Sequence, residues 1–218
     1  MKSLFTSILT AMLMAISLGA SAADPQPQLG IEFIQTPQVI PTDNPAKIEV
    51  TELFWYGCPH CYHFDAPLAA WVKALPKDVE FKRVPGVARP SWVPMAKAYY
   101  TLEALNLTEK LHSALFEAIH KQKSLKPDAD EPSVIDWITK QSGLDKKKVE
   151  DTYRSFSVTT KVSRAMQLFQ SSGATGVPSL LINGRFLTSS TMADGNENAL
   201  KVADYLLDQV RKEKAAKR

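Results

Sequence analysis

The sequence predicts an α/β fold whose single α/β domain is interrupted by an all-helical insertion. A strand, helix, strand pattern at 47–84 indicates the first part of that domain, because this pattern is typical of parallel strands joined by a helix. From 91 to 170 nearly every segment has apolar residues at helical three-and-four spacing. Strand patterns return at 179–187, before a last amphipathic helix.

The N-terminus has the pattern of a secretory signal peptide. Lys2 precedes an uncharged apolar stretch at 4–18, and the small residues Ala20 and Ala22 suit cleavage after Ala22. A retained membrane anchor is the alternative, but the apolar stretch is shorter than the ~20 residues of a spanning helix. Cleavage leaves 218 − 22 = 196 residues and, with Lys2 gone, lowers the formal net charge from +3 to +2. This near-neutral charge gives no reason to expect nucleic-acid binding.

The chain therefore divides into five expected segments. They are a signal peptide at 1–22, an N-terminal arm at 23–45, the first part of the α/β domain at 46–88, the helical insertion at 89–164 and the second part with its C-terminal helix at 165–218. This length suits one domain with an insertion.

The first part of the α/β domain has clear strand and helix signals. An alternating pattern at 31–34 in the Pro- and Gln-rich arm predicts an edge strand. Dense β-branched and aromatic residues predict a buried strand at 47–56. Pro59 suits the first turn of a helix at 60–74, where its missing N–H costs nothing. A second strand is expected at 79–84.

The rest of the chain is predicted to be five helices, a hairpin and a final helix. The helices are expected at 95–105, 109–121, 133–141, 145–156 and 158–170. Asp145 is a good N-cap, and Ser133 with Asp136 resembles a capping box. Asn183-Gly184 predicts a tight turn between strands at 179–182 and 185–187, and the final helix is expected at 196–213.

Cys58 and Cys61 are the two cysteines of the chain. A disulfide between them closes almost no loop and would stabilise little, so the pair suggests a redox centre. At a helix start, free N–H groups and the helix dipole favour a thiolate at Cys58, and Cys61 lies one turn inside on the same face. We expect Cys58 to be the exposed attacking sulfur and Cys61 the buried resolving one.

Metal and haem sites fit this pattern less well. Haem attachment requires His directly after the second Cys, and Tyr62 is there instead. A zinc site would need two more ligands, and the four histidines offer no matching second pair. We expect neither a metal nor a cofactor other than the cysteine pair. His112 and His120, on insertion helices, are expected to be surface or half-buried residues, and His63 structural or exposed.

Two segments carry a resemblance to a known family. The string from Phe54 to Tyr62, with Pro59-His60 between the cysteines, and the later 175–179 segment (TGVPS) resemble the two signature segments of the DsbA family. The resemblance covers the whole mature chain and implies a thioredoxin fold that is interrupted by the helical insertion. It also implies a low thiol pKa at Cys58 and a strongly oxidising disulfide, for which this family is itself the standard example.

The resemblance assigns roles to further residues. It makes Val177-Pro178 a cis-proline loop that faces the cysteine pair and binds substrate, where a plain trans turn is the alternative. Pro59 would keep the turn rigid and His60 would add a donor or a charge beside the thiolate. Glu52 resembles the buried acid beneath the resolving cysteine, with Arg83 in the place of the family's basic partner. The alternative for Glu52 and Arg83 is a surface salt bridge.

The function implied by the resemblance is the oxidation of exported proteins in the periplasm. The enzyme would donate the Cys58–Cys61 disulfide to reduced or unfolded clients through a mixed disulfide at Cys58. A quinone-linked inner-membrane partner of the DsbB type would then reoxidise it. An isomerase or reductase is a second hypothesis, but that class usually carries a dimerisation domain, for which the arm at 23–45 is too short, and we expect a monomer. A peptide-binding chaperone with a vestigial cysteine pair is a third.

Overall fold

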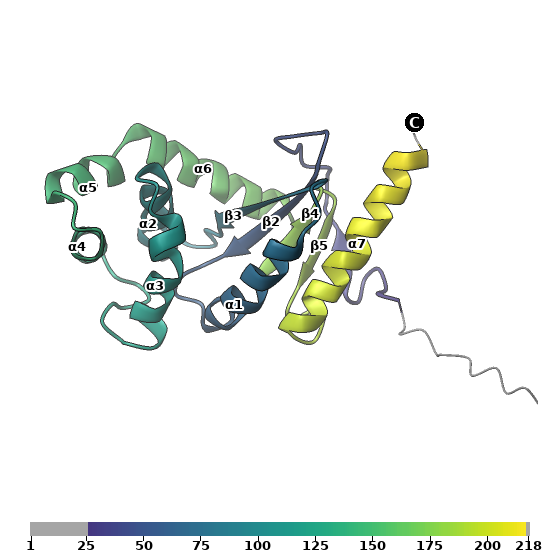
Figure 1. Ribbon diagram of the computed structural model, residues 1–218, viewed down its shortest axis with the longest axis horizontal. Coiled ribbons are helices and arrows are strands. Elements are labelled where there is room, and N and C mark those ends of the chain that lie inside the picture. The colour runs from purple at the N-terminus through teal and green to yellow at the C-terminus, as the bar shows by residue number, and fades with distance from the viewer. Residues whose placement is uncertain (1–25, 217–218) are drawn as a thin grey trace, which may run out of the picture.

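The computed structural model describes residues 26–216, so the predicted signal peptide lies outside the described residues (Figure 1). Within 26–216, no helix combines the length and apolar character that crossing a membrane requires. The described strands are β1 (Phe33–Gln35), β2 (Ile48–Phe54), β3 (Val79–Pro85), β4 (Ser179–Ile182) and β5 (Phe186–Ser189). The helices are α1 (Pro59–Ala74), α2 (Val93–Ala104), α3 (Thr108–His120), α4 (Glu131–Ser142), α5 (Lys146–Tyr153), α6 (Phe156–Ser171) and α7 (Asn196–Ala216), with a short 3₁₀ turn at Pro90–Trp92.

The sheet has the order β1-β5-β4-β2-β3. β2 runs parallel to β3, as the crossover through α1 requires, and antiparallel to β4. The predicted edge strand of the arm is present as β1, which pairs with β5. Every residue of β2, which lies between β4 and β3 in the sheet, is buried. The α/β fold with a helical insertion is therefore confirmed.

One face of the sheet is covered by α1 and α7, and the helices from the insertion gather at one end (Figure 1). Ile48 and Val50 of β2 pack with Phe64 and Leu68 of α1 in the hydrophobic cluster beneath α7. Because side chains alternate along a strand, Glu52 shares the face of Ile48 and Val50. The carboxyl group is thus placed toward α1, the helix that carries the cysteine pair.

The hairpin between β4 and β5 turns at the predicted dipeptide. Asn183 has a φ of 51° and Gly184 a φ of 63°, the left-handed values that a two-residue hairpin turn needs at both central positions. The second strand is at Phe186–Ser189, one residue later than its predicted start. Ile182 pairs with Phe186, so the turn is where it was predicted but the strand register differs by one residue from that of a two-residue hairpin.

The helix starts of the insertion differ in part from prediction. Asp145 caps α5 as expected, with its side chain accepting from Lys148 N. The capping box at Ser133 and Asp136 is wrong, because α4 begins at Glu131 and its cap is Asp130, which accepts from Ser133 N. Asp130 is a better acceptor than an internal Ser, and a proline follows in the first turn, where proline is favoured. The expected segment boundary after 164 falls inside α6.

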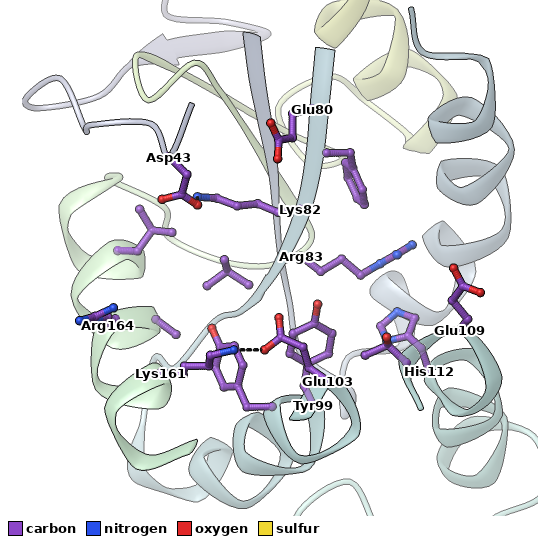
Figure 2. Close-up of a pocket in the computed structure, with 16 residues that line it drawn as sticks. Asp43, Glu80, Lys82, Arg83, Tyr99, Glu103, Glu109, His112, Lys161 and Arg164 are labelled. Atoms are coloured by element: carbon purple, nitrogen blue, oxygen red, sulfur yellow. Dashed lines mark hydrogen bonds and ion pairs between the residues drawn. The ribbon is translucent and has the colours of Figure 1, made fainter. Parts of the chain in front are cut away.

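An open pocket of about 660 Å³ separates the outer edge of β3 from α2, α3 and α6 (Figure 2). Its charged walls come from all four elements. They include Lys82 and Arg83 of β3, Glu103 of α2, Glu109 and His112 of α3, and Lys161 and Arg164 of α6. Lys82 pairs with Asp43 at 2.8 Å and with Glu49 at 3.0 Å, and Lys161 pairs with Glu103.

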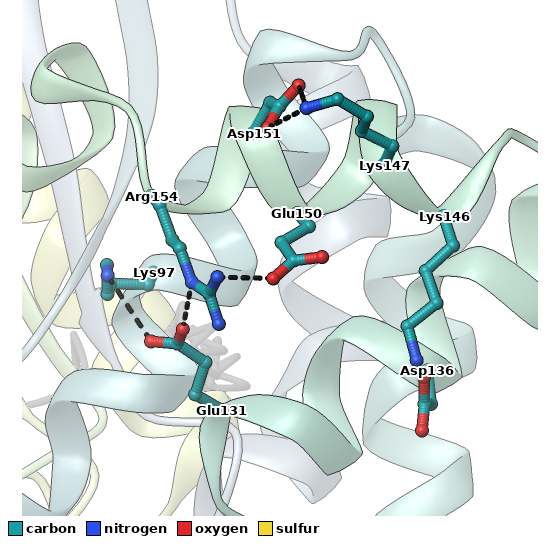
Figure 3. A network of polar contacts seen from close by, with 8 residues as sticks. All are labelled: Lys97, Glu131, Asp136, Lys146, Lys147, Glu150, Asp151 and Arg154. Carbon is teal, nitrogen blue, oxygen red and sulfur yellow. Dashed lines mark hydrogen bonds and ion pairs between the residues drawn. The ribbon is translucent and has the colours of Figure 1, made fainter.

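Ion pairs join the helices at the far end of the insertion (Figure 3). Arg154 pairs with Glu131 at 2.6 Å and also with Glu150, and Lys97 lies 3.7 Å from the same Glu131. Because Glu131 begins α4 and Arg154 follows α5, this network ties both helices to α2. Such partly exposed pairs stabilise by at most about 1 kcal/mol each, so the buried core holds the insertion and the ion pairs orient its ends.

Candidate active site

Cys58 is the N-cap of α1, and Pro59 is in the first turn, as predicted. Both cysteines are free thiols in this structure. Cys61 has no exposed surface, whereas Cys58 retains 9%. The prediction of an exposed Cys58 is therefore right only relative to Cys61, because the loop at Val177 packs against the Cys58 sulfur.

The two sulfurs have opposite pKa shifts. The pKa of Cys58 is lowered from 9.0 to about 6, first by the hydrogen bond from the Cys61 thiol, against burial, and then by the backbone N–H groups of Cys61 and His60. The charge of His60 is a smaller cause. Burial raises the pKa of Cys61 far above its usual value, and its hydrogen bond to Cys58 adds to this. Near neutral pH the pair therefore holds one thiolate, at Cys58.

The loop before β4 lies against Cys58. The Val177–Pro178 peptide bond is cis, as the resemblance implied, and the Cys58 thiol donates to the Val177 carbonyl oxygen at 3.3 Å. His60, Val177 and Pro178 line a groove that continues along the loop between β5 and α7. The groove therefore begins at the loop whose Val177 carbonyl contacts the Cys58 sulfur.

Glu52 is buried beneath the pair, with 1% of its surface exposed. It lies opposite Arg83 in the β2–β3 register, and Arg83 Nε donates to Glu52 Oε2 at 2.9 Å. Burial raises the pKa of Glu52 from 4.5 to about 7, although the charge of Arg83 opposes this shift. The alternative of a surface salt bridge is wrong for Glu52, while the Arg83 side chain keeps 22% exposure.

Asp65, one turn after Cys61 on α1, belongs to the same buried cluster and was not among the predicted site residues. Arg83 Nη2 lies 3.5 Å from Asp65 Oδ1, and Ser113 Oγ donates to Asp65 Oδ2 at 2.6 Å. His112 Nε2 lies 3.3 Å from Asp65 Oδ1, without the alignment of a regular hydrogen bond. A carboxylate at helical spacing from Cys61, between the buried Phe64 and Leu68, was the available signal.

The expectation for His112 is wrong, whereas His120 is half-buried, as expected. His112 is buried, and its Nδ1 lies 2.8 Å from the Tyr56 hydroxyl. His120 is partly buried, and its Nε2 lies 2.7 Å from the Tyr56 carbonyl oxygen. These contacts arise because α3 packs on α1, which the helical pattern of α3 alone does not reveal. His63 is exposed, as expected. Among residues 26–216, no group of three or more His, Cys, Asp or Glu side chains could hold a metal ion.

Trp55 and Trp92 form a stacked aromatic pair beside the turn that leads into α1. Trp55 stacks on Trp92 with ring centroids 4.2 Å apart and an interplanar angle of 4°. A Cβ atom at Gly57 would lie 2.4 Å from the Trp55 ring. A side chain at position 57 would therefore force the Trp55 ring to move from its stack on Trp92.

Comparisons with known proteins agree with this geometry. A family model described as a DSBA-like thioredoxin domain matches residues 79–207. The thiol:disulfide interchange protein DsbA of Pseudomonas aeruginosa is 39% identical over 94% of this chain and 96% of its own length. DsbA of Burkholderia cepacia is 38% identical over 98% of this chain and its full length. An alignment of that extent includes Cys58 and Cys61, which precede the family-model match.

Solved structures give the same result. The crystal structure of Pseudomonas aeruginosa DsbA superposes with a TM-score of 0.80 at 38% identity, covering 88% of this chain and 97% of that one. The oxidoreductase DsbA of Xylella fastidiosa gives a TM-score of 0.81 at 30% identity, covering 86% of this chain and all of that one. With the cysteine pair at the start of α1, these matches show that the chain belongs to the DsbA family of thiol:disulfide interchange proteins and is a thiol:disulfide oxidoreductase.

Proposed function

We propose that the enzyme donates its Cys58–Cys61 disulfide to reduced exported proteins through a mixed disulfide at Cys58. A client thiolate attacks Cys58 Sγ, the Cys58–Cys61 bond breaks, and Cys61 leaves as a thiolate that takes up a proton. A second client thiolate then attacks the client sulfur of the mixed disulfide and releases Cys58 as a thiolate. The client loses two electrons and the enzyme gains them, so the enzyme ends as the dithiol.

The opposite pKa shifts of the two sulfurs carry this proposal. A low pKa makes Cys58 a good leaving group in the second step, and stabilises the reduced form relative to the disulfide. A high pKa keeps Cys61 protonated once it has left. Glu52, with a pKa of about 7, is suited to give Cys61 this proton and to take it back during reoxidation.

The remaining roles follow the same arrangement. Val177 and Pro178 bind the client beside Cys58, Pro59 holds the turn and His60 adds a donor next to the thiolate. The cycle requires no cofactor besides the disulfide. Reoxidation falls to a quinone-linked inner-membrane protein of the DsbB type, and the predicted signal peptide directs the enzyme, as a monomer, to the periplasm.

Trapping the mixed disulfide tests the proposal. In Cys61→Ala, the Cys58 thiolate should attack a disulfide-bonded peptide and release one peptide thiolate, and the adduct should persist because no second thiol resolves it. Mass spectrometry should locate the peptide on Cys58. Cys58→Ala, which keeps the buried Cys61, should form no adduct and should oxidise no dithiol peptide. An adduct on Cys61, or client oxidation by Cys58→Ala, would overturn the assignment and favour a binding protein or a different nucleophile.

A further inference from the structure

Two buried carboxylates share one arginine beneath the cysteine pair. Arg83 donates through Nε to Glu52 at 2.9 Å and presents Nη2 to Asp65 at 3.5 Å. Glu52 is on β2 and Asp65 on α1, so Arg83 of β3 lies between the strand and the helix of the active site. The division of this one cation between the two acids therefore affects the charge state of both.

Asp65 has further partners from the helical insertion. Ser113 Oγ of α3 donates to Asp65 Oδ2 at 2.6 Å, and His112 Nε2 of α3 lies 3.3 Å from Asp65 Oδ1. Burial lowers the pKa of His112, so its ring is neutral near pH 7 and carries one N–H. A carboxylate can only accept, so the proton belongs on Nε2, and Nδ1 accepts from the Tyr56 hydroxyl at 2.8 Å.

Glu52 and Asp65 consequently differ in the number of groups that stabilise their charged forms. Burial acts to raise the pKa of Asp65, but its contacts with His112, Ser113 and Arg83 outweigh burial and lower it. Among the described side chains, Arg83 is the one that donates to Glu52. The pKa of Glu52 rises to about 7. A pair of acids whose environments separate their pKa values is the usual arrangement of a fixed charge beside a proton carrier.

We propose that Asp65, held by Ser113 and His112, is a positioning residue that keeps part of Arg83 away from Glu52 and so leaves Glu52 able to exchange a proton with Cys61. This inference rests on the proposed function and extends the proton-handling site to α3 of the insertion. Arg83 and His112 also line the open pocket beside β3 (Figure 2). The groove at His60, Val177 and Pro178 has a different set of lining residues. The arginine side of the cluster thus meets solvent away from the client groove.

The charged and titratable groups around Glu52 come from four elements and from the loop between β2 and α1. They are Arg83 of β3, Tyr56 of that loop, Asp65 and Cys61 of α1, and Tyr99 of α2, with His112 of α3 behind Asp65. Asp65 is the negative charge in this set that raises the pKa of Glu52. Removing that charge, or releasing Arg83 toward Glu52, changes the pKa of Glu52 in the same direction, downward.

The test follows the Glu52 carboxyl carbon by NMR across pH in the reduced full-length mature protein, with Glu52→Gln to assign the signal. In Asp65→Asn the pKa of Glu52 should fall from about 7 toward the ordinary carboxyl range. In Ser113→Ala, Asp65 loses a hydrogen-bond donor, so its carboxylate should interact more strongly with Arg83. Less of the Arg83 charge then stabilises ionised Glu52, and the pKa of Glu52 should rise. Asp65→Glu, which keeps the charge, should restore the value. Asp204→Asn is the matched control, because Asp204 accepts from Trp71 on the other side of α1 and should leave Glu52 unchanged.

Single-turnover oxidation of a dithiol peptide gives the functional readout. At about pH 8, Asp65→Asn should be slower than wild type by about tenfold for each unit by which the pKa of Glu52 falls, because less protonated Glu52 remains for Cys61. In a Glu52→Gln background Asp65→Asn should have no further effect on the pH profile. Two results would overturn this inference and leave the proposed function standing, provided that wild type oxidises the peptide. One is a pKa of Glu52 in Asp65→Asn that equals the wild-type value, and the other is a pKa of Glu52 that falls in Ser113→Ala as it does in Asp65→Asn. Failure of wild type itself to oxidise the peptide would instead overturn the proposed function.

Discussion

The Cys58 thiol donates to the Val177 carbonyl oxygen at 3.3 Å. A carbonyl accepts from a thiol but repels a thiolate, so this contact favours the protonated sulfur. The lowered pKa of Cys58 therefore results from stronger opposite effects, the Cys61 thiol first and the N–H groups at the start of α1 after it. In the proposed mixed disulfide Cys58 has no thiol proton to donate, so we expect the Val177 carbonyl to accept a hydrogen bond from the client backbone instead.

Alkylation of the reduced protein by iodoacetamide should modify Cys58 and spare Cys61. The rate at Cys58 should follow a pKa of about 6 and remain high well below the pH at which an ordinary thiol reacts. Peptide mapping after partial labelling identifies the site, and Cys61→Ala serves as a variant with one sulfur. In that variant the pKa of Cys58 should rise, because the hydrogen bond from Cys61 is lost. Equal labelling of both cysteines in wild type would contradict the assignment.

His60→Ala should make the enzyme a slightly weaker oxidant. The imidazole charge is the last of the causes that lower the pKa of Cys58, and the backbone N–H of residue 60 remains in the variant. We expect the reduction potential to fall by less than about 30 mV, which corresponds to about one pKa unit in a two-electron couple. Equilibration with glutathione buffers measures this change. A shift several times larger would mean that the imidazole, and not the helix start, controls the thiolate.

Gly57→Ala should destabilise the protein by about 1–3 kcal/mol, the usual cost of overpacking. The new Cβ would lie 2.4 Å from the Trp55 ring, which must then leave its stack on Trp92. Urea unfolding measures the loss, and Gly176→Ala is the control because a Cβ there meets nothing within 4 Å. In a Trp55→Ala background, which lacks the ring, Gly57→Ala should change the free energy of unfolding little. Equal costs in both backgrounds would contradict the steric explanation.

Local patterns predicted the parts of this structure that depend on neighbouring residues. The Asn183-Gly184 turn, the start of α1 at Pro59 and the burial of Glu52 all follow from spacing and residue type within one or two elements. The parallel pairing of β2 with β3 also agrees with the strand, helix, strand pattern, but that pattern does not predict the register that places Glu52 opposite Arg83.

The contacts that the sequence analysis missed depend on how α3 docks against α1. His112 and Ser113 face Asp65 because of that packing, and helical periodicity predicts an apolar face without identifying its partner. The position of Asp65 on the helix of Cys61 was readable, but its role needs Arg83 and α3 together. Cys58 is more buried than expected for a similar reason, since the loop at Val177 comes from a distant part of the chain.

Glu52→Gln should change the pH dependence of stability as well as the chemistry of Cys61. Burial raises the pKa of Glu52 to about 7 from 4.5, so between these values the folded protein keeps a proton that the unfolded chain has lost. The free energy of unfolding of wild type therefore falls as pH rises through this window, by up to about 3 kcal/mol from this group. Glutamine has no proton to lose, so this contribution should vanish in the variant.

Relative to wild type, Glu52→Gln should thus be more stable at about pH 8 than at about pH 5. Arg83 keeps a carboxylate partner in the variant, because Asp65 lies 3.5 Å from Nη2, so the substitution does not leave it as an unpaired buried charge. Urea unfolding of the reduced protein at the two pH values measures the difference. Glu49→Gln is the matched control, because Glu49 is on the same strand as Glu52 and its loss leaves Lys82 paired with Asp43. A pH-independent loss of stability in Glu52→Gln would mean that Glu52 is ionised throughout, a structural partner of Arg83, and that Cys61 receives its proton from water.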